Sequence, residues 1–250
     1  MIRLFQEKDT DVYWNLAMEH VLVTQANQHK QISIRIWRNQ PSVIIGRNQA
    51  LEIEVDTNYC NLNDIEICRR ISGGGAVYHD FGNYNTTFVL PIVPKKPKYA
   101  DIKEIGITVT NFQVDVLKKL GYDKIEIKNN TNILYQGRKI SGSAGYYFKS
   151  WYLHHSTLLV DADLEQLEKS LLVKDDIPDD KKRSKYAPTI NLGDIDPNLW
   201  GSELAKLISE DFHDEYKIIN YSDEEKNMAK ELENKMYRNS DWIKNGKRIM

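Results

Sequence analysis

The chain has 250 residues, of which 41% are hydrophobic and 28% charged, a composition typical of a soluble globular protein. Its net charge of −2 gives no reason to expect nucleic acid or an anionic membrane as the main partner. No apolar run approaches the roughly 18 residues of a membrane span, and the N-terminus lacks a signal-peptide core. The two cysteines, Cys60 and Cys68, have no metal-binding spacing, so we expect a cytoplasmic protein with free thiols.

The hydrophobic pattern predicts short strands mixed with helices, without an internal repeat. Apolar residues at helical spacing predict helices over 15–28, 56–63, 105–120, 164–171, 199–212 and 224–237. Alternation and short apolar runs predict strands at 33–38, 42–46, 66–69, 85–92, 125–127, 133–135, 152–160 and 216–219, and a further strand directly after residue 77. The charged segment 175–187 predicts a mobile surface loop. This order predicts an α+β fold with a mixed, largely antiparallel sheet flanked by helices.

Three consecutive glycines follow two arginines and a serine in the segment 69–75. Because glycine lacks a Cβ and tolerates positive φ, Gly73, Gly74 and Gly75 let backbone N–H groups approach a ligand closely. Such N–H groups beside Arg70 suit a carboxylate or a phosphate. The alternative interpretation of this segment is an exposed turn.

Lys139 and the histidine pair are the other polar groups in unusual settings. Lys139 is predicted in a turn of small residues, which leaves its ammonium group room to meet a ligand; the alternative is a solvated hairpin lysine. His154 and His155 follow each other in a strand and must face opposite sides, so we expect one to face the core or a pocket and the other solvent. Neither histidine has a spacing typical of a metal site.

Nucleophilic catalysis has little support in the sequence. Cys60 and Cys68 lie in a predicted helix and strand without an obvious base nearby, and no Gly-x-Ser-x-Gly elbow is present. The chain also has no Walker phosphate-binding motif, and its triple glycine is not a dinucleotide fingerprint. An anion cradle and a lysine without a nucleophile are typical of a protein that activates a carboxylate with a nucleotide.

The segments 69–80 and 137–144 together closely resemble lipoate–protein ligase, of the biotin/lipoate protein ligase family. The resemblance extends to 15–17, 43–49 and 154–159, so five segments in the same order cover roughly residues 12 to 220. It implies a catalytic domain of the biotin/lipoate ligase type. It also implies that residues 1–250 form a single catalytic domain and that the C-terminal accessory domain of many relatives is absent.

The resemblance implies that lipoate and MgATP give lipoyl-AMP, whose lipoyl group then passes to a lysine of an acceptor. ATP and Mg²⁺ are the implied cofactors, and lipoate is the substrate. The implied acceptors are lipoyl domains of 2-oxoacid dehydrogenase E2 subunits and the glycine-cleavage H protein, with a separate accessory protein as a further partner. An alternative is a lipoyl or octanoyl transferase that uses a preformed acyl donor without ATP. A lipoate-binding module without enzymatic activity is a third interpretation, and biotin ligase ranks low because its glycine–arginine loop differs.

The same resemblance assigns roles to individual residues. Lys139 would contact both the acyl carbonyl and the phosphate, and His79 and His155 would lie beside the lipoyl group or the acyl phosphate. Asn132 stands where many relatives carry an aspartate, so no metal is fixed by the protein alone, and Mg²⁺ would come with ATP near this residue. The resemblance also implies a set of residues that hold the adenylate, shape the lipoyl tunnel or otherwise bind substrate and nucleotide. These residues are Arg70, Ser72, Gly73, Gly74, Gly75, Ala76, Val77, Tyr78, His79, Asn83, Asn132, Ala144 and His155.

Overall fold

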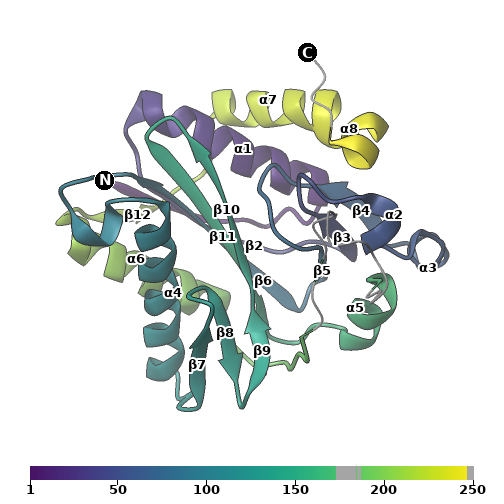
Figure 1. Ribbon diagram of the computed structural model, residues 1–250. Coiled ribbons are helices and arrows are strands. Elements are labelled where there is room, and N and C mark those ends of the chain that lie inside the picture. Colours follow the sequence, from purple (N-terminus) through teal and green to yellow (C-terminus); the bar gives the residue numbers. More distant parts are fainter. Residues whose placement is uncertain (173–183, 185–186, 247–250) are drawn as a thin grey trace.

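The largest sheet of the computed structural model, which describes residues 1–172, 184 and 187–246, has six strands (Figure 1). The strands β10, β11, β6 and β2 pair antiparallel, whereas β2, β1 and β12 pair parallel. In spatial order they are β10 (Ser143–Phe148), β11 (Trp151–Leu159), β6 (Asn83–Pro91), β2 (Ser33–Trp37), β1 (Ile2–Gln6) and β12 (Tyr216–Ile218).

Two smaller sheets flank this one. The first contains β4 (Glu66–Arg69), β3 (Ser42–Ile45) and β5 (Val77–His79), with β3 parallel to β4 and antiparallel to β5. The second is an antiparallel meander of β7 (Ile125–Lys128), β8 (Asn132–Tyr135) and β9 (Arg138–Ser141). Among the described strands, six of nine pairings are antiparallel, which confirms the predicted sheet type.

Helices cover both faces of the large sheet. Helix α1 (Val12–His29) lies across one face with α7 (Asp223–Leu232) beside it, and α4 (Ile102–Lys119) and α6 (Pro197–Phe212) cover the other (Figure 1). The shorter helices are α2 (Leu51–Glu54), α3 (Thr57–Leu62), α5 (Leu164–Ser170) and α8 (Ser240–Asn245), and α7 continues into a π-helical turn over Glu233–Tyr237. In the described chain, no helix is both long and apolar enough to span a membrane.

The start of α1 is determined by its cap. The carboxylate of Asp11 accepts hydrogen bonds from the backbone N–H groups of Tyr13 and Trp14, which have no partner within the helix. Apolar side chains surround much of the helix because it is packed between the sheet and α7. Each fully buried side chain such as Leu22 contributes about 1.5–3 kcal/mol to folding. Helix α1 is therefore held firmly against the large sheet.

Most predicted elements are confirmed, with ends that shift by up to three residues. Helix α4 ends before Gly121, which has a φ of +95°, as the sequence predicts. The hydrophobic pattern did not predict β1, β9, β10, α2 and α8. The prediction of a turn at Lys139 is wrong, because this residue lies within β9. Small residues around Ser141–Gly145 have low strand propensity, and they become strands by pairing with neighbours. The predicted loop at 175–187 lies outside the described residues except for Ser184 and Ala187.

Candidate active site

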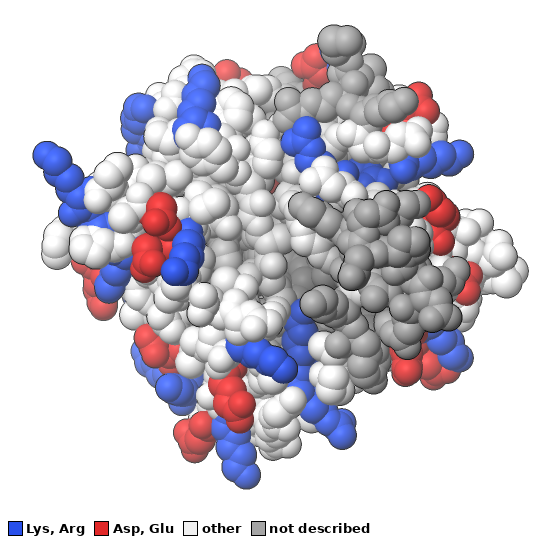
Figure 2. Space-filling view, viewed as in Figure 1, with Lys and Arg blue, Asp and Glu red and all other residues white. Residues whose placement is uncertain are grey.

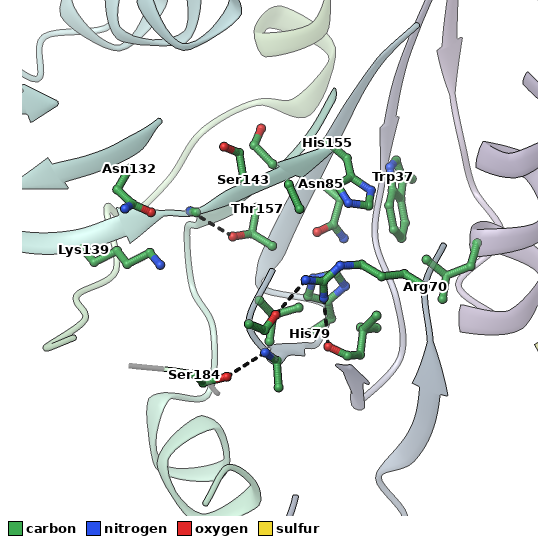
Figure 3. A pocket seen from close by; sticks show the side chains of 18 residues that line it. Trp37, Arg70, His79, Asn85, Asn132, Lys139, Ser143, His155, Thr157 and Ser184 are labelled. Carbon is green, nitrogen blue, oxygen red and sulfur yellow. Dashed lines mark hydrogen bonds between the residues drawn. The ribbon is translucent and has the colours of Figure 1, made fainter. Parts of the chain in front are cut away.

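A cavity of about 260 Å³ lies between α1, the large sheet and the loop from Arg70 to Ala76 (Figure 3). Lys139 and Asn132 lie at one end, and Trp37 lies toward the other, with His155 between them. Nine of the predicted site residues line this cavity: Arg70, Gly75, Ala76, Val77, His79, Asn132, Lys139, Ala144 and His155. Nine further residues line it and were not predicted as site residues: Leu16, Trp37, Ile44, Asn85, Gly142, Ser143, Ser156, Thr157 and Ser184.

The two ends of the cavity differ in polarity. Leu16, Trp37 and Ile44 form an apolar end between α1, β2 and β3. The opposite end carries the ammonium group of Lys139 and the amide of Asn132. An amphipathic ligand with an apolar chain and an anionic head fits this arrangement.

The glycine loop is held in shape by Arg70. Its Nη2 donates to the carbonyl oxygens of Gly73 and Gly75, both at 2.7 Å, and its Nη1 donates to the carbonyl of Ile44 at 3.1 Å. Burial lowers the pKa of Arg70 to about 10, so the guanidinium is still charged at neutral pH. Gly74 has a φ of +92°, a conformation that favours glycine. Most N–H donors of Arg70 thus bind carbonyl oxygens of the protein backbone. Its contact with an adenylate stays a prediction.

Several polar atoms in the cavity wall have no protein partner. Nδ1 of His79 accepts a hydrogen bond of 3.1 Å from the Asn39 amide, so the ring proton lies on Nε2. Burial, followed by the charges of Arg70 and His155, lowers the pKa of His79 to about 3, and the ring is neutral. Within the described residues, Nε2 of His79 and both amide atoms of Asn85 are buried without a hydrogen-bond partner. Because such atoms cost about 1–3 kcal/mol each, they indicate where a polar ligand group or water would bind.

Lys139 is half-buried in β9 and faces open space. A Cβ at Gly142 would lie 2.8 Å from Nζ of Lys139 and 3.7 Å from Oδ1 of Asn132, so glycine here leaves room for both side chains. No hydrogen bond or ion pair to the ammonium group is formed by any residue that the structure describes. Burial lowers the pKa of Lys139. The residue is therefore a partly desolvated cation available to an anionic ligand.

A second cavity, of about 450 Å³, adjoins the first. The two cavities share Lys139, the one charged residue among the described residues that line both. Tyr78 and Asn83 line the second cavity rather than the first, and the Asn83 amide donates to the Tyr78 carbonyl at 3.3 Å. Ser72, Gly73 and Gly74 are in the lining of neither. The predicted site residues therefore divide into two neighbouring sites and a supporting loop.

The prediction that one histidine of the pair faces solvent is wrong. His155 is buried in the cavity wall, and His154 is buried on the opposite face of the sheet, against Phe88 and near Gly106 of α4. Burial, followed by the charge of His155, lowers the pKa of His154 to about 3. Both faces of β11 are covered by helices, which is why neither ring reaches water.

The two thiols lie outside both cavities. Cys60 and Cys68 are free thiols, as predicted, and both are buried. Burial raises the pKa of Cys60 to about 11 and raises that of Cys68 as well. A thiol of raised pKa carries little thiolate at neutral pH, so neither cysteine has the properties of an acyl-accepting nucleophile.

The layered sheet, the arginine-held glycine loop and the two adjoining cavities define an α+β fold of the biotin/lipoate ligase type. The chain belongs to the family described as the lipoyl protein ligase A/B catalytic domain, whose model matches residues 11–212. This confirms the resemblance found in the sequence.

The relatives agree with this assignment. The chain is 30% identical to lipoate-protein ligase A subunit 1 of Thermoplasma acidophilum, over 96% of this chain and 94% of that protein. A structure of the bipartite lipoate protein ligase of the same organism, studied with its E2 lipoyl domain, superimposes with a TM-score of 0.84 at 26% identity, covering 99% of this chain and 98% of that one. A lipoate-protein ligase A bound with ATP superimposes with a TM-score of 0.82 at 28% identity, covering 98% and 99%.

Asn85, Thr157 and Trp37, three of the lining residues that were not predicted, share a position in the large sheet. Asn85 and Thr157 are opposite each other in β6 and β11, and Trp37 is opposite Asn85 in β2, so the three lie in one row across the sheet. Polar residues within apolar strands, such as Asn85, mark the wall of a site because they need a partner. Alternation along each strand predicts their shared face, but not that the three strands are neighbours.

Proposed function

We propose that this chain activates lipoate with MgATP to give lipoyl-AMP and transfers the lipoyl group to a lysine of a lipoyl domain. Membership of the lipoyl protein ligase family supports this proposal, as do the names of the relatives. The proposal covers the finer steps of the reaction, the acceptor and the roles of individual residues.

One observation carries the proposal: two cavities meet at a partly desolvated lysine. The smaller has an apolar end made by Leu16, Trp37 and Ile44, which suits an acyl chain, because each buried methylene gains about 0.8 kcal/mol. The larger, of about 450 Å³, has room for a nucleoside. A carboxylate at the end of the acyl chain would reach Lys139, where the α-phosphate would also lie.

In the first step, a carboxylate oxygen of lipoate attacks the α-phosphorus of ATP, and the bond to pyrophosphate breaks. Two anions must approach each other, so fixed positive charge is needed at the junction. Lys139 would supply this charge, and the Asn132 amide lies at the same end of the cavity. The loop held by Arg70 would present backbone N–H groups to the adenylate.

In the second step, the neutral amine of the acceptor lysine attacks the acyl carbonyl, and the C–O bond to AMP breaks. Negative charge develops on the carbonyl oxygen and then on the leaving phosphate. Lys139 would stabilise both, since it lies where the two cavities join. The proton lost by the attacking amine passes to water or to the departing phosphate.

Mg²⁺ is proposed to enter the site with ATP. Among the residues that the structure describes, no group of three His, Cys, Asp or Glu side chains could hold a metal, and the cavity that contains Asn132 is lined by no acidic residue. Mg²⁺ prefers phosphate oxygens and retained waters. We therefore treat it as part of the MgATP substrate, and its position near Asn132 stays a prediction.

The proposed partners are a lipoyl-domain acceptor and a separate accessory protein. The Thermoplasma relative is named subunit 1 of its ligase, and the related structure belongs to a bi-partite system studied with an E2 lipoyl domain. Glycine-cleavage H protein and a cytoplasmic location are further proposals that follow from the same family. In the view of Figure 2, Lys and Arg side chains and Asp and Glu side chains both lie around the rim of the molecule.

The decisive test is the intact mass of an apo-lipoyl domain incubated with the chain, lipoate and MgATP. A lipoyl mass gain would establish a self-sufficient ligase. A gain that requires added lipoyl-AMP would instead establish transfer alone, and activation would then need the accessory protein or would belong to another enzyme. No gain with either donor, for an E2 lipoyl domain and an H protein alike, would refute the proposed function. The buried thiols disfavour the cysteine-dependent octanoyl transfer alternative.

A further inference from the structure

A buried carboxylate on α1 collects hydrogen bonds from two walls of the acyl cavity. Glu19 is 2% exposed, and its Oε1 accepts a bond of 2.5 Å from the hydroxyl of Thr87. Both of its oxygens lie 3.0 Å from Nδ1 of His155. The hydroxyl of Thr87 in turn accepts a bond of 2.8 Å from the indole N–H of Trp37. Trp37 and His155 line the cavity, whereas Glu19 and Thr87 lie behind them.

The direction of these bonds follows from the chemistry of a carboxylate, which in its ionised form only accepts. Burial acts to raise the pKa of Glu19, but the charge and hydrogen bond of His155 and the hydrogen bond of Thr87 outweigh it, and the pKa is lowered. Nδ1 of His155 must therefore carry a proton, and the Thr87 hydrogen must point at Glu19. The Thr87 hydroxyl and Nδ1–H of His155 therefore both donate to the Glu19 carboxylate.

On its far side, His155 is linked to the glycine loop. Its Nε2 lies 2.7 Å from Oγ of Ser72, which also accepts a bond of 2.9 Å from Nε of Arg70. Arg70 holds the carbonyls of Gly73 and Gly75. The orientation of the His155 ring thus connects α1 to the loop that closes the cavity.

We propose that Glu19 is a positioning residue that orients His155 directly and Trp37 through Thr87, and so sets the shape of the acyl cavity. The inference rests on the proposed function only in taking lipoate as the ligand of that cavity. It concerns acyl binding, at the end of the cavity away from Lys139.

The same atoms resemble a Ser–His–Glu triad, but the geometry excludes a nucleophilic role for Ser72. This serine is 1% exposed and lines neither cavity, so an acyl carbonyl has no path to its Oγ. Oγ also accepts from the Arg70 guanidinium, which lowers its nucleophilicity. The network therefore holds the site rather than forming an acyl-enzyme.

Glu19→Gln is the sharpest test, because it keeps the size of the side chain and removes one of two acceptor oxygens. Both oxygens of Glu19 lie 3.0 Å from Nδ1 of His155, so in either amide orientation the NH₂ group of glutamine would face the Nδ1–H donor of His155. We expect the NMR signals of His155, Trp37 or both to shift. The ¹⁵N signals of the His155 ring would report a changed tautomer, and the indole N–H signal of Trp37 would report a changed hydrogen bond. We also expect the Kd for lipoate, measured by calorimetry, to rise by about tenfold, as for loss of a bond to a charged group. The Kd for ATP should change less than twofold.

Two further variants separate positioning from general destabilisation. Thr87→Val removes only the branch to Trp37, so it should shift the indole signal and leave the His155 ring signals in place. Glu231→Gln changes an exposed glutamate paired with Lys235 and should shift neither signal nor either Kd. All measurements are made at a temperature where circular dichroism shows each variant folded.

Unchanged His155 and Trp37 signals in Glu19→Gln would overturn the proposal, as would equal weakening of lipoate and ATP binding. The spectra need no ligand and no turnover, so they test the network even if no lipoyl-AMP is formed. A wild-type chain that shows the network but binds no lipoate would count against the proposed function alone.

Discussion

Replacing Lys139 with methionine should slow both proposed half-reactions about 10²-fold while leaving the fold intact. The perturbation removes the charge but keeps most of the aliphatic stem of the side chain. Nothing else in the described structure depends on the ammonium group, because no hydrogen bond or ion pair is made to it. The effect on rate therefore isolates the interaction with the reacting anions.

The magnitude follows from the half-buried position of Lys139. A preorganised donor to a developing oxyanion is worth about 3 kcal/mol, and about 1.4 kcal/mol corresponds to a tenfold change in rate. Because the cation lies where the two cavities join, the same loss should appear in adenylation and in transfer. A residue that contacted only one of the two ligands would affect one step.

Two assays separate the steps: pyrophosphate release with lipoate and MgATP, and lipoyl transfer from added lipoyl-AMP to a lipoyl domain. Lys128→Met is the matched control, because Lys128 belongs to the same small sheet and is exposed. Near-normal rates of both steps in Lys139→Met would refute the role assigned to Lys139. A loss confined to one step would show that the lysine serves only that step.

The lowered pKa of Lys139 also predicts a gain in stability for Lys139→Met. Burial penalises the ammonium form in the folded state, and this penalty is fully present at neutral pH, where the lysine is protonated in both states. It disappears as pH rises through the lowered folded pKa toward the unfolded value. The variant should therefore have a higher Tm than the wild type at pH 7, and a smaller advantage at alkaline pH.

Three further outcomes are expected. Gly142→Ala should leave Tm nearly unchanged but slow lipoyl-AMP formation about tenfold, since the new Cβ would displace the Lys139 ammonium group from 2.8 Å away. Arg70→Lys should lower the stability measured in urea by about 2–4 kcal/mol, because a lysine cannot span the two glycine carbonyls and leaves them unpaired. Native Cys60 and Cys68 should resist iodoacetamide at pH 8, and alanine variants of either should keep lipoyl transfer; loss of transfer in either would revive the cysteine-dependent mechanism.

The sequence predicted best those elements whose pattern depends only on neighbouring residues in the chain. Helix α4, which ends before Gly121, follows from apolar spacing and from the glycine alone, and the strands around the glycine loop follow from short apolar runs. The loop and Lys139 were found because their residue types are unusual in their local setting. The strand that contains Lys139 was missed, since its small neighbours have little strand propensity and depend on pairing with β8.

The chemistry of the site was visible in the sequence, because glycines, an arginine and a lysine keep their properties wherever the chain folds. Their division into a smaller cavity, a larger cavity and a supporting loop was decided by the tertiary structure. Arg70 faces its own loop, both histidines of the pair are buried, and Glu19 meets His155 although 136 positions separate them. Pairing across strands that are distant in the chain sets these contacts, and no local pattern specifies which strands become neighbours.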